Sequence, residues 1–314
     1  MKQLTYIFLT LFGTTMLIAC SSGAGNDTNT AGGGRGGIQN GFLSLAITDA
    51  PIDDAAEVWV RFDGVELKPA STENVVTLTF KPPMEINLLA LQGQNKVQML
   101  TNATLPAGNY DWIKLKVTAK NDGLLDSYIK LDDNSVHELD IPSGSESGLK
   151  IIGGLEVIAN TPKSMTIDFD LRKSIVMTGV AQYTLRPVLR IVDDTAVGSI
   201  EGTIEVSALS DSDCPDADPS TGNAVYLYSG LNISPDDIDD IDPEPVASVI
   251  PTLNKLTGIF EYEFGFIPSG QYTAAFTCEA NLDDPMTDDV IIFSRGVKNI
   301  TLANTNKVSV NAFR

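Results

Sequence analysis

The residues in this sequence that could do chemistry are mainly carboxylates. Forty-one aspartates and glutamates accompany only 21 lysines and arginines and one histidine. Calcium takes six to eight oxygen ligands, which acidic loops can supply. Three groups of closely spaced aspartates stand out: Asp211, Asp213, Asp216 and Asp218; Asp236, Asp237, Asp239, Asp240 and Asp242; and Asp283, Asp284, Asp288 and Asp289. The simpler interpretation of all three is a solvated acidic surface, and calcium at the middle group is the alternative.

The middle group does not follow the EF-hand pattern, because no glycine occurs between Asp236 and Glu244 to make the sharp turn of that loop. Ser234-Pro235 followed by two aspartates is instead typical of a helix start. Serine is a good N-cap, proline suits the first helical position, and acids favour the positive end of the helix dipole. The pattern therefore predicts a short helix here.

Catalytic chemistry has weaker support. His137 is the only histidine, and it lies in an alternating segment typical of a surface strand. Asp168 and Asp170 are two residues apart, so they point to the same face of a strand and could hold a proton or a cation. A polar strand face beside Arg172 and Lys173 explains them more simply. A glycoside hydrolase needs two carboxylates at a set separation in a cleft, which a sequence does not show.

Cys20 ends an apolar N-terminal segment. Lys2 supplies a positive charge, residues 7–18 are mostly apolar, and the small Ala19 precedes the cysteine. This layout is typical of a secretory signal peptide. About 13 apolar residues are fewer than the roughly 20 that span a bilayer, so a transmembrane anchor is disfavoured.

The motif Leu17-Ile18-Ala19-Cys20 resembles the signal of bacterial lipoproteins. The resemblance implies removal of residues 1–19 and acylation of Cys20, with palmitate among the acyl chains, so the partner of Cys20 would be a lipid bilayer. Ser21 at the next position favours the outer membrane over the inner membrane of the bacterial cell envelope. An ordinary secretory signal with a chance cysteine is the alternative. Residues 20–40 are glycine-rich and predict a flexible tether.

The other two cysteines, Cys214 and Cys278, lie 64 residues apart. Because exported proteins meet an oxidising compartment, this pair predicts a disulfide. Closing a loop of this length would stabilise the fold by about 4 kcal/mol. Two buried free thiols are the alternative.

The elements that must position these groups are strands. Ile113 to Val117 alternates apolar residues with lysines, and Val75 to Phe80 alternates apolar residues with threonines before Pro82-Pro83, where we expect that strand to stop. Tyr183 to Val192 alternates as one further strand. Besides the helix start at Ser234, a helical turn is expected at Leu88 to Leu91. The pattern predicts an all-β protein of two tandem antiparallel β-sandwiches, residues 41–197 and 198–314.

A short motif occurs once in each predicted sandwich. Pro106-Ala107-Gly108-Asn109-Tyr110 and Pro268-Ser269-Gly270-Gln271-Tyr272 each predict a turn that delivers a tyrosine onto the next strand. The same turn occurs in prealbumin-like and carboxypeptidase-regulatory-like sandwiches, which residues 198–314 resemble.

The first sandwich resembles one family over roughly residues 40–195. The motifs that carry this resemblance are Thr48-Asp49-Ala50-Pro51, Val58-x-Val60-x-Phe62-Asp63-Gly64-Val65, Asn87-Leu88-Leu89-x-Leu91, Pro106-Ala107-Gly108-x-Tyr110, Asp168-Phe169-Asp170 with Lys173-Ser174, and Tyr183-x-Leu185-Arg186-Pro187-Val188. In this order they are similar to domain of unknown function 4382, found in bacterial lipoproteins. That family has no established activity, so the resemblance implies no catalytic residues.

The negative charge of the chain excludes one class of partner. The chain has a formal net charge of −20, and residues 198–314 alone hold 19 acidic and 5 basic residues. Such a surface repels phosphate backbones, so nucleic acid is excluded as a partner. The sequence favours a lipid-anchored envelope protein that is not an enzyme and that binds a glycan, a protein or an envelope component. The alternative is a carboxylate-dependent hydrolase acting on an envelope or extracellular polymer.

Overall fold

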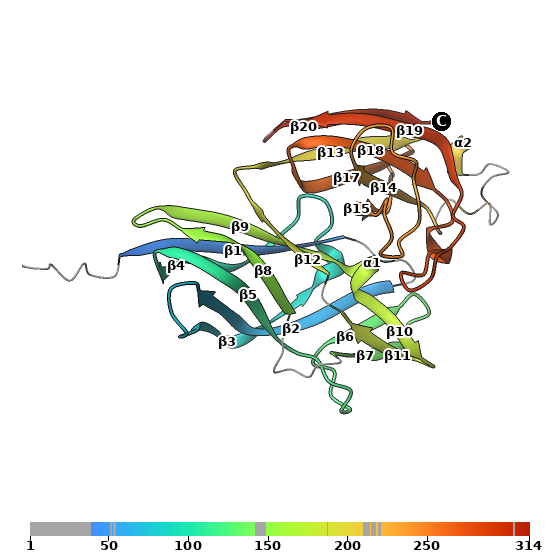
Figure 1. The fold of residues 1–314 in the computed structure, drawn as a ribbon. Helices are drawn as coiled ribbons and strands as arrows, with labels where there is room; N and C mark the ends of the chain where they lie inside the picture. The colour runs from blue at the N-terminus through green and yellow to red at the C-terminus, as the bar shows by residue number, and fades with distance from the viewer. Residues whose placement is uncertain are drawn as a thin grey trace, which may run out of the picture. The chain divides into compact units, whose positions relative to one another are not determined.

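The computed structural model describes residues 39–50, 52, 55–141, 149–186, 188–209, 214, 218, 221–303 and 305–314. Residues 38–314 form one compact unit. The predicted all-β fold is confirmed: strands dominate, and helix is confined to two four-residue α-helices and two short 3-10 helices among the described residues (Figure 1). The predicted tether lies outside the described residues except at its end.

The first half of the chain forms two sheets. The smaller sheet has the strand order β12-β9-β1-β4, and the larger has the order β10-β11-β7-β6-β2-β5-β8, with β3 also paired to β2. The bounds of these elements are β1 Asn40–Ala50, β2 Ala55–Pro69, β3 Val76–Asn87, η1 Leu88–Ala90, β4 Val97–Pro106, β5 Gly108–Thr118, β6 Tyr128–Leu131, β7 Val136–Asp140, β8 Leu149–Val157, β9 Pro162–Asp170, α1 Leu171–Ser174, β10 Ile175–Gly179, β11 Gln182–Leu185 and β12 Leu189–Asp193. The predicted helical turn at Leu88 is the 3-10 helix η1.

The second half forms two four-stranded sheets, with the orders β16-β17-β13-β20 and β15-β14-β18-β19. Their elements are β13 Val197–Ile204, α2 Val206–Leu209, β14 Ala224–Ser229, β15 Pro245–Val249, β16 Thr252–Asn254, β17 Ile259–Pro268, β18 Gly270–Thr277, η2 Ala280–Leu282, β19 Phe293–Leu302 and β20 Lys307–Phe313. The predicted boundary at residues 197/198 falls at the start of β13.

Each half has its own hydrophobic core. Fully buried Phe62, Phe169 and Leu105 belong to the core of the first half, and Phe276 and Phe313 belong to the core of the second. All of these residues except Phe276 alternate with wetter neighbours along their strands, so the period-2 pattern of the sequence selects which face packs inward. Around Phe276, both faces of β18 are buried. In β5, Ile113, Leu115 and Val117 are buried while the lysines between them are half-buried on the other face.

The sheets are not purely antiparallel. β1 pairs in parallel with β9, β13 pairs in parallel with β20, and β11 pairs in parallel with β7. Parallel neighbours need a long connection, and here many residues separate the strands of each pair. In Figure 1, β1 at the blue end of the chain therefore lies beside the much later β9.

The two halves repeat one arrangement around the proline-glycine-tyrosine motif. β1 and β13 each pair antiparallel with the strand that ends at the motif proline, β4 and β17 respectively. The hydroxyl of Tyr110 donates to the carbonyl of Pro106 at 2.8 Å, and the hydroxyl of Tyr272 donates to the carbonyl of Pro268 at 2.8 Å. Each corner then passes the chain to the opposite sheet, through β5 or β18. The short motif therefore marks equivalent corners of two related halves.

A tight crossing recurs at the equivalent place in each half. A Cβ on Gly41 would lie 2.3 Å from the carbonyl oxygen of Ile158, and a Cβ on Gly198 would lie 2.3 Å from the carbonyl oxygen of Asn306. Glycine is needed at both places because another stretch of backbone passes against the strand. This shared requirement is a second sign that the two halves are related.

Two strand predictions were wrong in their bounds. β3 does not stop at Pro82-Pro83: it pairs only with β2, and its register shifts between Thr79 and Met84, so the prolines lie in a bulge of an edge strand. The segment from Tyr183 to Val192 is not one strand either. It divides into β11 and β12, which belong to different sheets.

Candidate functional site

The predicted signal motif of Leu17, Ile18 and Ala19 and the acylated Cys20 lie outside the described residues, so they stay predictions. Most of the first aspartate group, Asp211 to Asp216, also lies outside them. Among the described residues, no helix is long and apolar enough to cross a membrane.

Aspartates from two loops that are distant in the sequence meet beside the sheet formed by β14, β15, β18 and β19. One loop, residues 230–244, connects β14 to β15, and the other, residues 283–292, leads from η2 into β19. Two groups of carboxylates each have ligand atoms within 4.8 Å of one another, and Asp237 belongs to both: Asp237, Asp239 and Asp288; and Asp237, Asp283 and Asp289. We call these five residues the aspartate cluster.

Asp237 is the centre of the aspartate cluster. Its side chain is 1% exposed. Its Oδ2 accepts the backbone N–H of Asp289 at 2.5 Å, while its Oδ1 is buried and has no hydrogen-bond partner. A buried carboxylate oxygen without a partner is costly, so native proteins rarely keep one without compensation.

The 230–244 loop is held against its sheet by tyrosines. β14 is buried on both faces: Val225 and Leu227 face the main core, while Tyr226 and Tyr228 pack with Ile238 of the loop. Tyr228 donates its hydroxyl proton to the carbonyl of Asp236 at 2.5 Å. The loop therefore has a defined path over the sheet.

The helix predicted after Ser234 does not form in the 230–244 loop, all of which the structure describes. The backbone N–H groups of Asp239 and Asp240 donate to the Glu244 carboxylate, at 2.7 Å and 2.5 Å, instead of to helical carbonyls. Ile238 is buried under the tyrosines, and the Glu244 carboxylate accepts the loop's N–H groups. Together these interactions stabilise the non-helical loop more than a helix cap would stabilise a helix, because a local cap is worth only about 1 kcal/mol.

Asp283 joins the other loop to the same place. Its Oδ2 accepts the hydroxyl of Tyr226 at 2.5 Å, and its Oδ1 accepts the N–H of Ile238 at 3.1 Å. Burial raises the pKa of Asp283 to about 6, although these hydrogen bonds act in the opposite direction. The carboxylate is therefore poorly solvated and surrounded by other acids.

Only some of the five predicted calcium candidates lie in the aspartate cluster. It brings Asp237 and Asp239 into the cluster, whereas no group found among the described residues includes Asp236, Asp240 or Asp242. Asp283, Asp288 and Asp289 come from the third aspartate group of the sequence. Sequence spacing shows the groups but not which loops meet, because that depends on how β14 and β18 pair.

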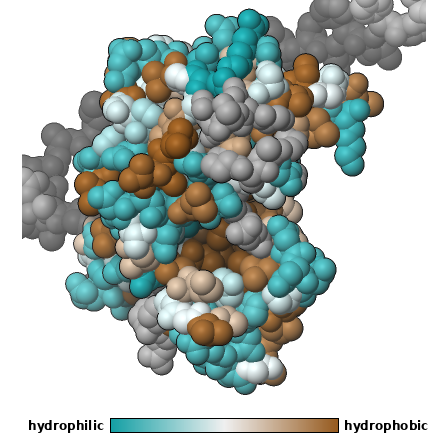
Figure 2. Space-filling view, turned by 90° about the vertical axis from the view of Figure 1, so that its right-hand side faces the viewer, coloured by the Kyte–Doolittle hydropathy of each residue, from teal (hydrophilic) through white to brown (hydrophobic). Residues whose placement is uncertain are grey.

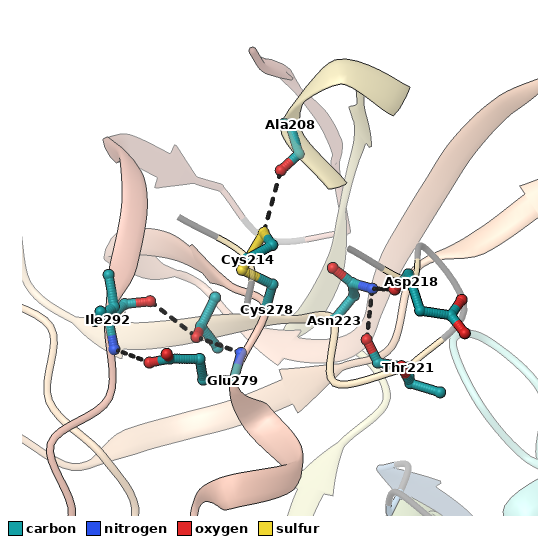
Figure 3. The surroundings of a disulfide bond; sticks show 9 residues. Ala208, Cys214, Asp218, Thr221, Asn223, Cys278, Glu279 and Ile292 are labelled. Atoms are coloured by element: carbon teal, nitrogen blue, oxygen red, sulfur yellow. Dashed lines mark hydrogen bonds between the residues drawn. A yellow bond between two sulfur atoms is a disulfide. The ribbon is translucent and has the colours of Figure 1, made fainter. Parts of the chain in front are cut away.

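The cysteine pair lies beside this region. Cys214 and Cys278 form a disulfide bond with a Cα–Cα distance of 5.4 Å, and both are buried in the second core (Figure 3). Glu279, the next residue, accepts the N–H of Ile292 at 2.8 Å through its Oε2. The disulfide is thus one residue away from a contact that holds the end of the 283–292 loop.

Three glutamates converge at a surface depression of about 580 Å³, lined by Glu201, Glu261, Glu263, Tyr262 and Lys307 among others. The ammonium of Lys307 lies 2.6 Å from Glu201 and 3.4 Å from Glu263. The Lys307 hydrogen bond lowers the pKa of Glu201 below its ordinary value. A glycosidase pairs a carboxyl of raised pKa, the general acid, with an ionised carboxylate, and the shift at Glu201 is of the second kind.

The other acid–base candidates have structural partners. Asp168 accepts from Nε of Arg190 at 2.5 Å, and the cavity that both residues help to line is about 20 Å³, room for about one water. Asp170 caps α1 by accepting the N–H of Lys173 at 3.1 Å. The ring of His137 packs 5.1 Å from that of Tyr183.

The outer face of the large sheet carries aromatic side chains. The rings of Trp59 and Tyr128 stack with centroids 6.5 Å apart, and Nε1 of Trp59 donates to Glu57 at 2.6 Å. Further along the sheet, Trp112 pairs with Ile152, which is 81% exposed, and the ammonium of Lys150 lies 4.7 Å from the Trp112 ring. We call Trp59, Tyr128 and Trp112 the aromatic face.

Elsewhere, exposed apolar side chains are spread over the molecule. Figure 2 shows one face on which hydrophilic side chains surround apolar ones, some of them in a hollow. Val180, Leu256 and Val290 are each more than 90% exposed and lie on three different segments. Single exposed apolar residues are normal in soluble proteins, so these do not by themselves define a site.

The structure therefore defines an acidic all-β protein of two related halves, with an aspartate cluster and an aromatic face. Residues 40–187 match the family described as domain of unknown function (DUF4382). This match confirms the resemblance predicted for the first half. No curated protein matches the chain.

Solved structures show only distant similarity. The TIE protein of Bacillus anthracis is 13% identical with a TM-score of 0.19, and the match covers 87% of this chain but only 33% of that protein. The shaft pilin SpaA of Lactobacillus rhamnosus GG is 10% identical with a TM-score of 0.19, over 88% and 98% of the two chains. The minor pilin GBS52 of Streptococcus agalactiae is 11% identical with a TM-score of 0.16, over 86% and 95%. Scores this low do not establish a common fold.

Proposed function

We propose that this protein is a lipid-anchored protein of the bacterial cell envelope whose β-sandwiches bind a glycan or another envelope component without catalysis. The observation that carries the binding role is the aromatic face. Aromatic rings on an open sheet offer apolar area, and the polar groups between them offer hydrogen bonds. Sugars present both kinds of surface, so a glycan fits this chemistry better than an apolar ligand does.

The charged groups beside the rings add polar partners. Lys130 lies 3.0 Å from Glu57, and Lys114 lies 2.6 Å from Glu66, all on the outer side of β2, β5 and β6. These pairs are partly exposed, so they contribute little to stability and can exchange partners for a ligand's hydroxyl groups. The face is therefore rich in donors and acceptors without an acid–base pair arranged for hydrolysis.

Binding can be tested on an array of envelope and extracellular glycans with the purified full-length protein. Trp59→Ala should reduce the signal of bound glycans at least tenfold, because stacking area and a positioned donor are lost together. Leu256→Ala is a matched control, since this residue is 97% exposed and lies in the other half. Undiminished binding by both Trp59→Ala and Trp112→Ala would contradict the aromatic face as the site.

Anchoring rests on the N-terminal motif, and the buried disulfide supports export to an oxidising compartment. Cys20→Ser should leave unprocessed precursor or release the protein into the soluble fraction, because an acyl thioether cannot form on serine. Detergent partition and fatty-acid labelling measure this, with Ser22→Ala as a control that keeps the thiol. Normal lipid labelling of Cys20→Ser would contradict the proposal.

The hydrolase alternative is less well supported. The depression around Glu201 and Glu263 is the best candidate for it, yet Lys307 forms ion pairs with both carboxylates and so gives them a structural partner. Turnover of an array glycan that is lost in Glu201→Gln would support that alternative instead.

A further inference from the structure

The aspartate cluster concentrates negative charge around one buried carboxylate, that of Asp237. Asp237, with 1% of its side chain exposed, lies among carboxylates from both loops. Like charges this close destabilise one another, and the low dielectric of a buried site strengthens the effect. Folding this region therefore requires something that offsets the repulsion.

The unpartnered Oδ1 of Asp237 is the second observation. The other oxygen of the same carboxylate accepts a backbone N–H, so the side chain is held in one orientation. Its Oδ1 is buried and accepts no hydrogen bond. An oxygen in this state is suited to a ligand that contributes positive charge and accepts an oxygen lone pair.

The donor set selects the type of cation. Both groups consist of carboxylates only, with no histidine or cysteine among them. Zinc prefers nitrogen and sulfur, and magnesium keeps several waters and uses one or two carboxylates, whereas calcium accepts six to eight oxygens in flexible geometry. Groups of three carboxylates that share Asp237 and come from two loops, with water completing the shell, match calcium best.

We propose that Asp237, Asp239, Asp283, Asp288 and Asp289 form a calcium site that joins the 230–244 loop to the 283–292 loop. Asp237 bridges the two carboxylate groups, and the other residues supply ligands from either side. The site is separate from the aromatic face and from the anchor, so its failure leaves the proposed function intact.

The expected affinity is that of an extracellular calcium module, with a dissociation constant of about 10⁻⁴ to 10⁻³ M. Ligand that binds only the folded state raises its stability in proportion to the logarithm of ligand concentration. At roughly one hundred times the dissociation constant, the melting temperature should rise by about 5 °C.

The experiment is a calcium titration of the full-length oxidised protein after treatment with a chelator, followed by calorimetry and thermal unfolding. Wild type should bind calcium and melt at a higher temperature in CaCl₂ than in NaCl of equal ionic strength. An equal rise in NaCl would mean that charge screening alone acts, and an equal response to MgCl₂ would mean a non-selective acidic surface. Either result would overturn the proposal.

The variant Asp237→Asn tests whether the Asp237 carboxylate itself binds calcium. The amide is nearly the same size but removes one buried charge, so the calcium-free variant should be at least as stable as wild type while calcium affinity falls at least tenfold. A residue that acts only as a hydrogen-bond acceptor would leave the calcium response unchanged, because the amide oxygen of asparagine can still accept the N–H of Asp289. An unchanged calcium response would therefore contradict a ligand role.

Asp242→Asn is the matched control, because it makes the same change in the same loop outside the cluster and should keep the calcium response. Should Asp237→Asn fail to fold, Asp288→Asn decides the question, since Asp288 is exposed and tolerates substitution. Loss of affinity in Asp288→Asn supports the site, and wild-type affinity there overturns it.

Discussion

Reduction of the Cys214–Cys278 disulfide should lower the stability of the second sandwich by about 4 kcal/mol, the value expected for closing a loop of this length. Two features make this half depend on the bond. Residues 198–314 carry 19 acidic and 5 basic residues, so self-repulsion opposes compaction. Both sulfurs also lie inside the core, so opening the bond leaves two thiols in a packed site.

The unfolding of the two halves can be measured separately. Both tryptophans, Trp59 and Trp112, lie in the first half, so tryptophan fluorescence reports on that half alone. The melting temperature from circular dichroism should fall by on the order of 10 °C on reduction, while the fluorescence transition shifts much less.

The variant pair Cys214→Ser with Cys278→Ser should reproduce the effect of reduction without any reductant, and it serves as the control for off-target effects of the reducing agent. Non-reducing peptide mapping provides the direct check. Both thiols reacting freely with an alkylating agent in exported protein would contradict the disulfide.

Much of the fold could be predicted because it depends on local alternation. The period of two at Ile113 to Val117 assigns the buried face of β5 correctly, and the two proline-glycine-tyrosine motifs mark equivalent corners. Alternation identifies faces but not partners. The parallel pairing of β1 with β9 therefore could not be predicted, since it depends on the path of the whole intervening chain.

The aspartate cluster could be predicted only in part for the same reason. The groups containing Asp237 and Asp283 are visible in the sequence, but their meeting depends on the tertiary position of two loops. The helix signal at Ser234 was misleading, because burial of Ile238 and the hydrogen bonds to Glu244 are tertiary effects that a local cap does not reveal. Nothing in the local sequence indicates that Oδ1 of Asp237 lacks a donor.

Replacement of Arg172 should also lower the stability of the protein strongly. It lies in α1, is 4% exposed, and makes contacts with the second half of the chain. Its Nε lies 3.3 Å from Oγ of Ser248, its Nη1 donates to the carbonyl of Ala280 at 3.0 Å, and its guanidinium lies 5.7 Å from the centre of the Tyr226 ring. A planar guanidinium can make these contacts together, which an ammonium cannot.

Arg172→Ala should lower the free energy of unfolding by about 3–5 kcal/mol, the cost of removing one partner from a buried charged network. The variant leaves the Ala280 carbonyl without this donor and removes a positive charge that lowers the pKa of Asp283, so that carboxyl should become still harder to ionise. Arg172→Lys should recover only part of the loss, because it restores the charge but not the fork of donors.

Urea unfolding measures the effect, with tryptophan fluorescence for the first half and circular dichroism for the whole chain. Because Arg172 joins α1 to β15 and η2, its loss should move the fluorescence and circular dichroism transitions further apart than they are in wild type. Lys120→Ala is the matched control: it removes an exposed positive charge from the first half, so the free energy of unfolding should change by less than about 0.5 kcal/mol. Transitions in Arg172→Ala that keep the wild-type midpoints and the wild-type separation would show that this contact does not couple the two halves.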